Sequence, residues 1–76
     1  TTISYDMSED NFVNLTIFDL AGKKIKILLN ESMVAGFRSV RWRGLDEQYQ
    51  PVSTGVYLCV FQAGNFRETK KIILLK

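Results

Sequence analysis

The stretch FRSVRWRGLDEQYQPVSTGVY, residues 37–57, decides the fold of this chain. In its first part, Val40 and Trp42 alternate with arginines, which is the period-two pattern of a half-buried strand. Gly44 ends this segment, and a polar loop with the single proline of the chain follows. A second strand opens after Gly55. The stretch is therefore typical of the framework of a small all-β domain.

The same alternation recurs on both sides of this stretch, and residues that favour turns separate the apolar segments. Residues 30–36 are predicted to be a connection. A helix competes only over residues 23–32, where the alternation and the β-branched isoleucines favour a strand. Short strands at regular spacing predict a sandwich or barrel. The six expected strands lie near residues 2–7, 13–18, 24–29, 40–43, 56–61 and 66–75.

The length and composition allow one domain with one apolar core. A chain of 76 residues buries only roughly 60% of its unfolded surface, so its interior must be dense. Hydrophobic residues make up 46% of the chain, which favours a folded domain over disorder. Trp42 is the expected centre of the interior. The residues predicted to build the core are Tyr5, Leu15, Ile17, Trp42, Gly55 and Tyr57.

Charge is distributed unevenly along the chain. Residues 1–19 hold four acids and no base, whereas the remainder holds ten bases against four acids. Such asymmetry can mark a surface for polyanions. Here the bases alternate with apolar residues, which favours solvent-facing positions that protect strand edges. Since the aromatic residues fall at core positions, we predict no nucleic-acid partner.

The residues that usually carry catalysis are scarce. The chain has no histidine, and its single cysteine, Cys59, can form neither an internal disulfide nor a zinc site. The acid pairs at residues 9–10 and 46–47 lie in predicted turns. We therefore expect no enzyme, no cofactor and no metal, with a calcium site at Asp46 and Glu47 as the minor alternative. No apolar run approaches the ~20 residues that span a membrane.

Two segments are apolar where a strand should face solvent. If Tyr57 and its alternate neighbours face the core, Val56, Leu58 and Val60 face outward. The last strand is apolar on both faces at residues 72–75. A strand buried on both sides implies a cover, which could be the parent protein, a partner or a weakly associated second copy.

Taken in order, several motifs resemble one family. They are Tyr5, the run 17–22, the pair Trp42 and Gly44, the run 51–57, and the closing residues 70–76. Together they resemble the type A C-terminal sorting domains carried by cargo of the type IX, or Por, secretion system. They are also similar to the immunoglobulin-like domain of the flagellar hook-capping protein. The resemblance covers essentially the whole chain.

The resemblance implies an immunoglobulin-like antiparallel β-sandwich of about six to seven strands, formed by residues 1–76 as a single domain cut from a longer secreted protein. It also implies a sorting address, which takes an upstream cargo domain across the outer membrane to the cell surface. The implied partners are the type IX machinery and a sortase-like protease. Arg43 and Tyr49 depart from the usual family residues, which affects the loop rather than the sandwich. The part carried over as the sorting signal is Lys70, Lys71, Ile72, Ile73, Leu74, Leu75 and Lys76.

Three hypotheses of function follow. The first is a non-enzymatic sorting and anchoring module. The second is a structural spacer or assembly domain, similar to the hook cap, whose outer apolar face packs on a neighbour. The third is a carbohydrate-binding module that uses Trp42 or Tyr49 as a stacking platform.

Overall fold

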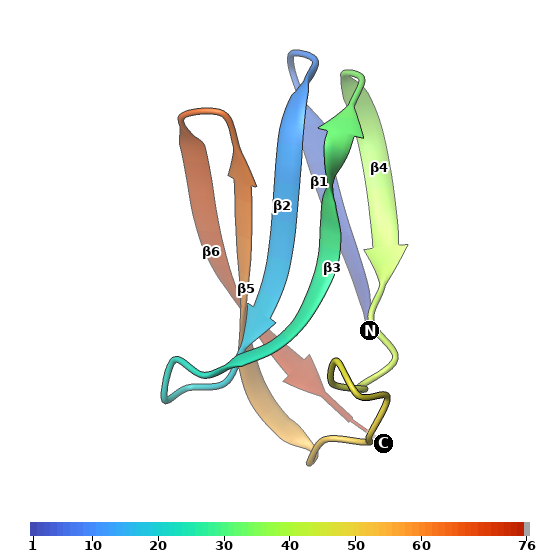
Figure 1. Cartoon of the computed structure of the whole chain (residues 1–76), viewed down its shortest axis with the longest axis vertical. Coiled ribbons are helices and arrows are strands. Elements are labelled where there is room, and N and C mark those ends of the chain that lie inside the picture. The colour runs from blue at the N-terminus through green and yellow to red at the C-terminus, as the bar shows by residue number, and fades with distance from the viewer. Residues whose placement is uncertain (76) are drawn as a thin grey trace.

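The computed structural model describes residues 1–75 and is all-β, as predicted (Figure 1). Within these residues there is no helix, so the competing helix over 23–32 is absent and a strand takes its place. The strands are β1 (Thr2–Met7), β2 (Asn11–Phe18), β3 (Lys24–Met33), β4 (Gly36–Arg41), β5 (Gly55–Ala63) and β6 (Phe66–Leu74).

The strands form two antiparallel sheets. β1 pairs with β4 in a two-stranded sheet, and the other four strands follow the order β3-β2-β5-β6. The turns after β1, β3 and β5 lie at one end of the molecule, and the β2–β3 hairpin and the long loop before β5 lie at the other (Figure 1). The sheets pack on each other, which confirms the predicted antiparallel sandwich. It has six strands.

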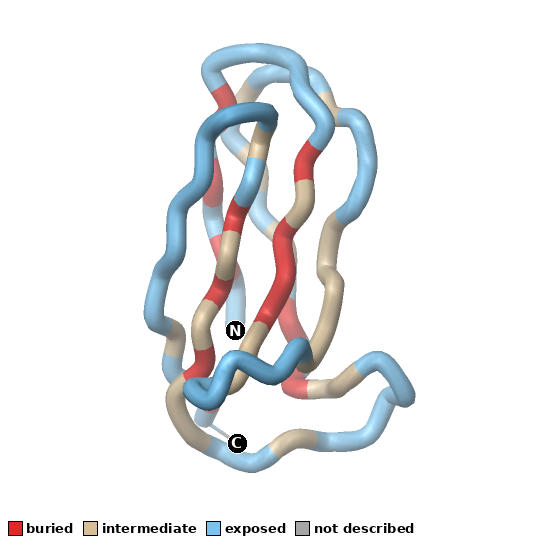
Figure 2. Tube along the Cα trace, turned by 60° about the vertical axis from the view of Figure 1, so that its left-hand side comes forward, coloured by how far each residue is buried: buried red, intermediate tan, exposed pale blue. Residues whose placement is uncertain are grey.

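The core lies between the sheets and is made of alternate residues. Figure 2 shows the buried positions recurring along the strands with less buried ones between them. This is the outcome of a period of two, because successive side chains of a strand point to opposite faces. The buried apolar residues are Ile3, Tyr5 and Met7 of β1, Val13, Leu15 and Ile17 of β2, Tyr57, Cys59 and Phe61 of β5, Leu74 of β6, and Trp42.

Trp42 is buried in the middle of the core at one end of the sandwich. Its side chain is only 1% exposed, and the indole N–H donates to the backbone oxygen of Leu45 over 3.0 Å. Its ring meets that of Tyr57 edge-on, with centroids 5.0 Å apart. The Tyr57 hydroxyl in turn donates to the backbone oxygen of Ser53 over 2.6 Å. Both amphipathic aromatics thus bury their rings and satisfy their polar atoms, as burial requires.

The prediction of a connection over residues 30–36 was wrong. β3 continues to Met33, which pairs with Asn11 at the start of β2. β2 begins earlier than predicted, so its additional residues offer backbone partners to the extra residues of β3. The side chains of Asn14 and Asn30 also meet across the pair, with a hydrogen bond of 3.2 Å. The true connection to β4 is only residues 34–35.

The β2–β3 register slips twice, between Leu15 and Thr16 and between Ile17 and Phe18. Such bulges leave an extra residue on one strand and bend it. They explain why residues 25–29 of β3 are all partly buried instead of alternating cleanly.

The loop between β4 and β5 is held by two acids. The carboxylate of Asp46 accepts hydrogen bonds from the backbone N–H groups of Gln48 and Gln50, both over 2.9 Å. Glu47 accepts the backbone N–H of Ile27 over 2.5 Å and forms an ion pair of 3.6 Å with Lys26. The loop is thereby tied to the bulged part of β3.

Candidate functional site

β6 is an edge strand. It pairs only with β5, so its other side presents backbone groups with no strand beside them within residues 1–75. Unpaired strand edges are the usual template for adding a further strand. Six of the seven residues predicted as the sorting signal, from Lys70 to Leu75, lie on β6 or directly after it. The seventh, Lys76, lies outside the described residues.

The pairing register divides these six residues between two faces. Leu74, Ile72 and Lys70 stand opposite Gly55, Tyr57 and Cys59, and opposite residues share a face of the sheet. This is the core face. Lys71 and Ile73 lie on the other face, across from Leu58 and Val56.

Burial follows from this division. Leu74 is 4% exposed and Ile72 is partly buried, whereas Ile73 is 61% exposed and Leu75 is 78% exposed. Lys70 and Lys71 are exposed as well. The predicted signal therefore contains two side chains that pack the fold and four that are open to a partner.

Lys70 is exposed although it points to the core face. The two-stranded sheet is narrower than the four-stranded one, and it leaves part of β6 uncovered. Lys70 instead meets Glu68 on the same face of β6, with 3.5 Å between ammonium and carboxylate. Charges that point inward on an edge strand discourage edge-to-edge aggregation.

The outer face of the four-stranded sheet carries Val56, Leu58 and Val60, as expected. These side chains are partly buried, because neighbours on the same face cover them. Thr16, opposite Val60, is only 4% exposed. The charged residues that the register places on this face within the described chain are all bases: Lys24, Arg67 and Lys71.

The structure also places the other predicted residues. Of the six predicted core residues, Tyr5, Leu15, Ile17, Trp42 and Tyr57 are buried and Gly55 is partly buried. The proposal of Trp42 as an exposed sugar platform was wrong, because the indole is inside the core. Tyr49 is 72% exposed, and the ammonium of Lys26 lies 4.8 Å from the centre of its ring. That cation occupies one face of the only aromatic platform left to the carbohydrate hypothesis.

Cys59 is a free and buried thiol, as predicted. Burial raises the pKa of Cys59 from an ordinary value of 9.0 to about 11, with a smaller opposing effect from the nearby Lys70 ammonium. The thiolate is the reactive form, so at pH 8 this change lowers its fraction by roughly a hundredfold.

We expect iodoacetamide at pH 8 to alkylate Cys59 at least about a hundredfold more slowly in the native domain than in the unfolded chain, for this reason. The measurement is the time course of mass increase with and without denaturant. Similar rates in the two conditions would show that the thiol is accessible in the native state.

No group of three or more His, Cys, Asp or Glu side chains suited to a metal ion occurs in the part of the chain that the structure describes. Over the same residues, none of the elements is a helix long and apolar enough to cross a membrane. Among the described residues the surface has open strand edges, and the edge of β6 is bordered by basic and apolar side chains. These features define a small antiparallel β-sandwich with exposed edges.

Comparison with known families names that class more closely. The family model of the secretion system C-terminal sorting domain matches residues 1–75, and the chain belongs to this family. This confirms the resemblance to type IX sorting domains that the residue pattern indicated. Searches of curated proteins and of solved structures each found no match.

One feature of the site was not anticipated from the sequence. β1 is also an edge strand within residues 1–75, and a hollow lies between its end and the β5–β6 turn. The alternation of Ile3, Tyr5 and Met7 correctly indicated one buried face of this strand. Nothing in a local pattern tells which side of a strand lacks a partner.

Proposed function

We propose that this domain is a non-enzymatic sorting and anchoring module that directs an upstream cargo protein through the type IX secretion system to the bacterial cell surface. The observation that carries the proposal is the family match over residues 1–75. Its partners are the translocation machinery and a sortase-like protease that separates domain from cargo. The domain contributes an address and no chemistry of its own.

The mechanism that the fold supports is recognition of β6 as an accessible strand. An added strand would take main-chain hydrogen bonds from the free edge of β6. Backbone pairing alone carries little sequence information, so side chains must supply the specificity. Lys71 and Ile73 on the outer face, and Leu75 beyond the strand, are the exposed side chains that a receptor can contact.

Burial of Leu74 serves this mechanism indirectly. Because Leu74 and Ile72 pack against the core face, they hold the end of β6 on the sheet. The exposed residues between and after them are then presented in one fixed geometry. A receptor meets an ordered strand and does not have to order a flexible tail, which would lower the affinity.

The test is a fusion of residues 1–76 to the C-terminus of a fluorescent reporter that carries an export signal for the inner membrane, in a host with a type IX system. We expect reporter at the cell surface or in the medium only when both the domain and an intact secretion system are present. A host with the system deleted is the control. Equal surface reporter with and without the domain would contradict the proposal.

The spacer hypothesis rests on one observation, the basic and partly apolar outer face of the four-stranded sheet. If the domain were only a spacer that packs on a neighbouring domain, export of the reporter would be the same with and without it. The same fusion therefore separates the two functions.

A further inference from the structure

β1 has backbone groups with no partner along one side. Thr1 and Trp42 are joined by two backbone hydrogen bonds. The N–H of Trp42 donates to the backbone oxygen of Thr1 over 2.8 Å, and the N-terminal ammonium of Thr1 donates to the backbone oxygen of Trp42 over 3.0 Å. In an antiparallel pair, such bonded pairs alternate with pairs that are not bonded to each other. The register then directs the N–H and C=O groups of Thr2, Ser4 and Asp6 away from β4.

No second strand accepts these groups within residues 1–75, since the sheet consists of β1 and β4 alone. The buried residues Ile3, Tyr5 and Met7 use their backbone groups toward β4 and their side chains toward the core. Pairing with β4 and packing of these side chains in the core thus hold the free edge of β1 in place.

A hollow of about 410 Å³ lies beside the end of this edge, near the β5–β6 turn, with Met7, Phe61 and Phe66 among its lining residues. Farther along β1, Ile3 and Tyr5 face Glu68 and Lys70 of β6 across a separate depression of only about 10 Å³. The rings of Phe61 and Phe66 stand 6.1 Å apart, and Phe66 remains 56% exposed.

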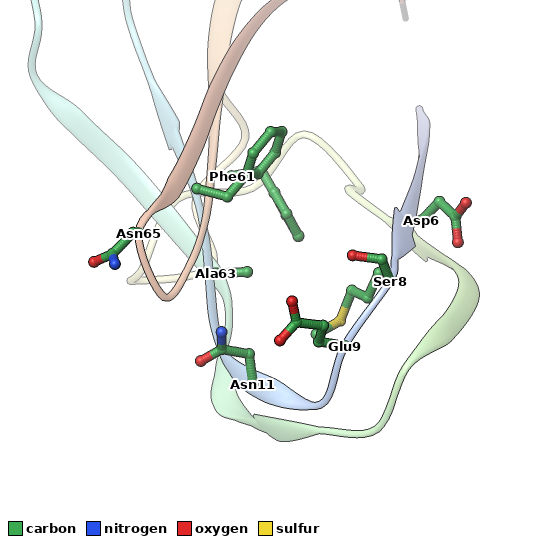
Figure 3. A pocket seen from close by; sticks show the side chains of 9 residues that line it. Asp6, Ser8, Glu9, Asn11, Phe61, Ala63 and Asn65 are labelled. Carbon is green, nitrogen blue, oxygen red and sulfur yellow. The ribbon is translucent and has the colours of Figure 1, made fainter.

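The rim of the pocket is polar and acidic. Figure 3 shows the side chains of Ser8 and Glu9 beside β1, with Phe61 and Ala63 across the gap from them. Among the described residues, Glu9 takes part in no ion pair of the structure. No base lines this hollow among the described residues, and Lys70, which lies farther along β1, is already paired with Glu68. An extended segment with alternate apolar residues and a basic end matches this lining in both shape and charge.

From this geometry we propose that β1 and the hollow beside it accept an extended basic peptide segment as an added strand. The segment pairs with Thr2, Ser4 and Asp6 through its backbone, places apolar side chains over Phe61 and Phe66, and sets a Lys or Arg beside Glu9. The two-stranded sheet thereby gains a third strand, which covers the exposed part of β6. Of the closing residues of β6, Lys70 borders this site, and the proposal does not depend on the role of those residues in export.

The probe is an acetylated heptapeptide amide in which valine alternates with threonine between two terminal lysines. Amide hydrogen exchange of the unsubstituted domain is followed by NMR with and without the peptide. We expect the N–H groups of Thr2, Ser4 and Asp6 to exchange at least about tenfold more slowly when the peptide is bound, since they gain partners. The N–H groups of Ile3 and Tyr5 are already paired and change little.

A matched pair of variants tests the edge itself. Ser4→Pro removes an N–H that points to the free edge of β1, and it breaks no bond to β4. Ser39→Pro makes the same change in the residue opposite Ser4, but at the far edge of β4. We expect Ser4→Pro to weaken peptide binding by about tenfold or more and Ser39→Pro to leave it within about twofold. Thermal unfolding checks that both variants fold.

Charge is tested in the same assay. We expect Glu9→Gln to weaken binding by about two- to fivefold, as for an exposed ion pair, with no effect on a peptide whose lysines are replaced by threonine. Three outcomes of the peptide assay would overturn the proposal: no binding up to about 1 mM peptide, protection at the β4 edge instead, or equal binding by the two proline variants. Protection of β1 that rises with protein concentration alone would assign the edge to a second copy and also overturn it.

Discussion

Replacing Trp42 by alanine is expected to remove most of the free energy of unfolding of this domain. Truncating a buried tryptophan typically costs about 3–5 kcal/mol. The indole is 1% exposed here, and its loss also leaves the backbone oxygen of Leu45 without its donor. Total stabilities of domains are only about 5–15 kcal/mol, and small domains lie at the low end. The free energy of unfolding is measured by urea titration followed by circular dichroism.

The matched control is Tyr49→Ala, another aromatic truncation within the same loop region. Tyr49 is 72% exposed, so we expect a loss below about 1 kcal/mol. The midpoint of thermal unfolding should fall by more than about 10 °C for Trp42→Ala and by only a few degrees for the control. If the two variants were equally stable, Trp42 would not be the centre of the core.

The second large effect is expected at the closing strand. Deleting residues 70–76 would remove the buried side chain of Leu74, which is 4% exposed, and the pairing of residues 70–74 with β5. A loss of export by this deletion would therefore not distinguish lost recognition from lost folding. The exposed side chains allow a cleaner test. We expect the triple variant Lys71→Ser, Ile73→Ser and Leu75→Ser to reduce export of the reporter fusion by on the order of tenfold or more, because a few contact residues dominate most interfaces. Surface reporter is measured by flow cytometry.

Stability is the control for this variant. The replaced side chains are exposed, so the isolated domain should unfold within about 1 kcal/mol of the parent. A second variant, Phe12→Ser and Val34→Ser, removes exposed apolar side chains elsewhere on the surface and should export normally. Normal export of the triple variant would show that the signal is not read from these side chains of β6.

Much of this architecture could be predicted from the alternation of residue types. The inward sets Ile3–Tyr5–Met7, Val13–Leu15–Ile17 and Tyr57–Cys59–Phe61 follow from a period of two and are all buried. Trp42 lies at the end of a predicted strand, two residues before Gly44, and this position indicated that it is the core residue of that region. The order of short motifs indicated the family. These are local properties, because a strand's faces are determined by its own residues.

The extent of β3 was beyond such reasoning. Residues 30–33 are polar apart from Met33 and resemble a connection, yet they pair with residues 11–14 of β2. Two register slips in the same pair also disturb the alternation. Whether a polar segment becomes a strand depends on what backbone lies beside it, and that partner is 16 residues away for the Asn14–Asn30 pair.

The amino-acid sequence by itself thus determined the strands, the residues of the interior and the family. The tertiary structure decided the rest: that Ile72 and Leu74 hold β6 while Lys71, Ile73 and Leu75 remain open, and that β1 has a free edge beside a hollow. The physical reason is that side-chain direction is a property of each strand alone. Which edges are paired and which parts of a sheet are covered depend on the unequal widths of two sheets assembled from distant segments.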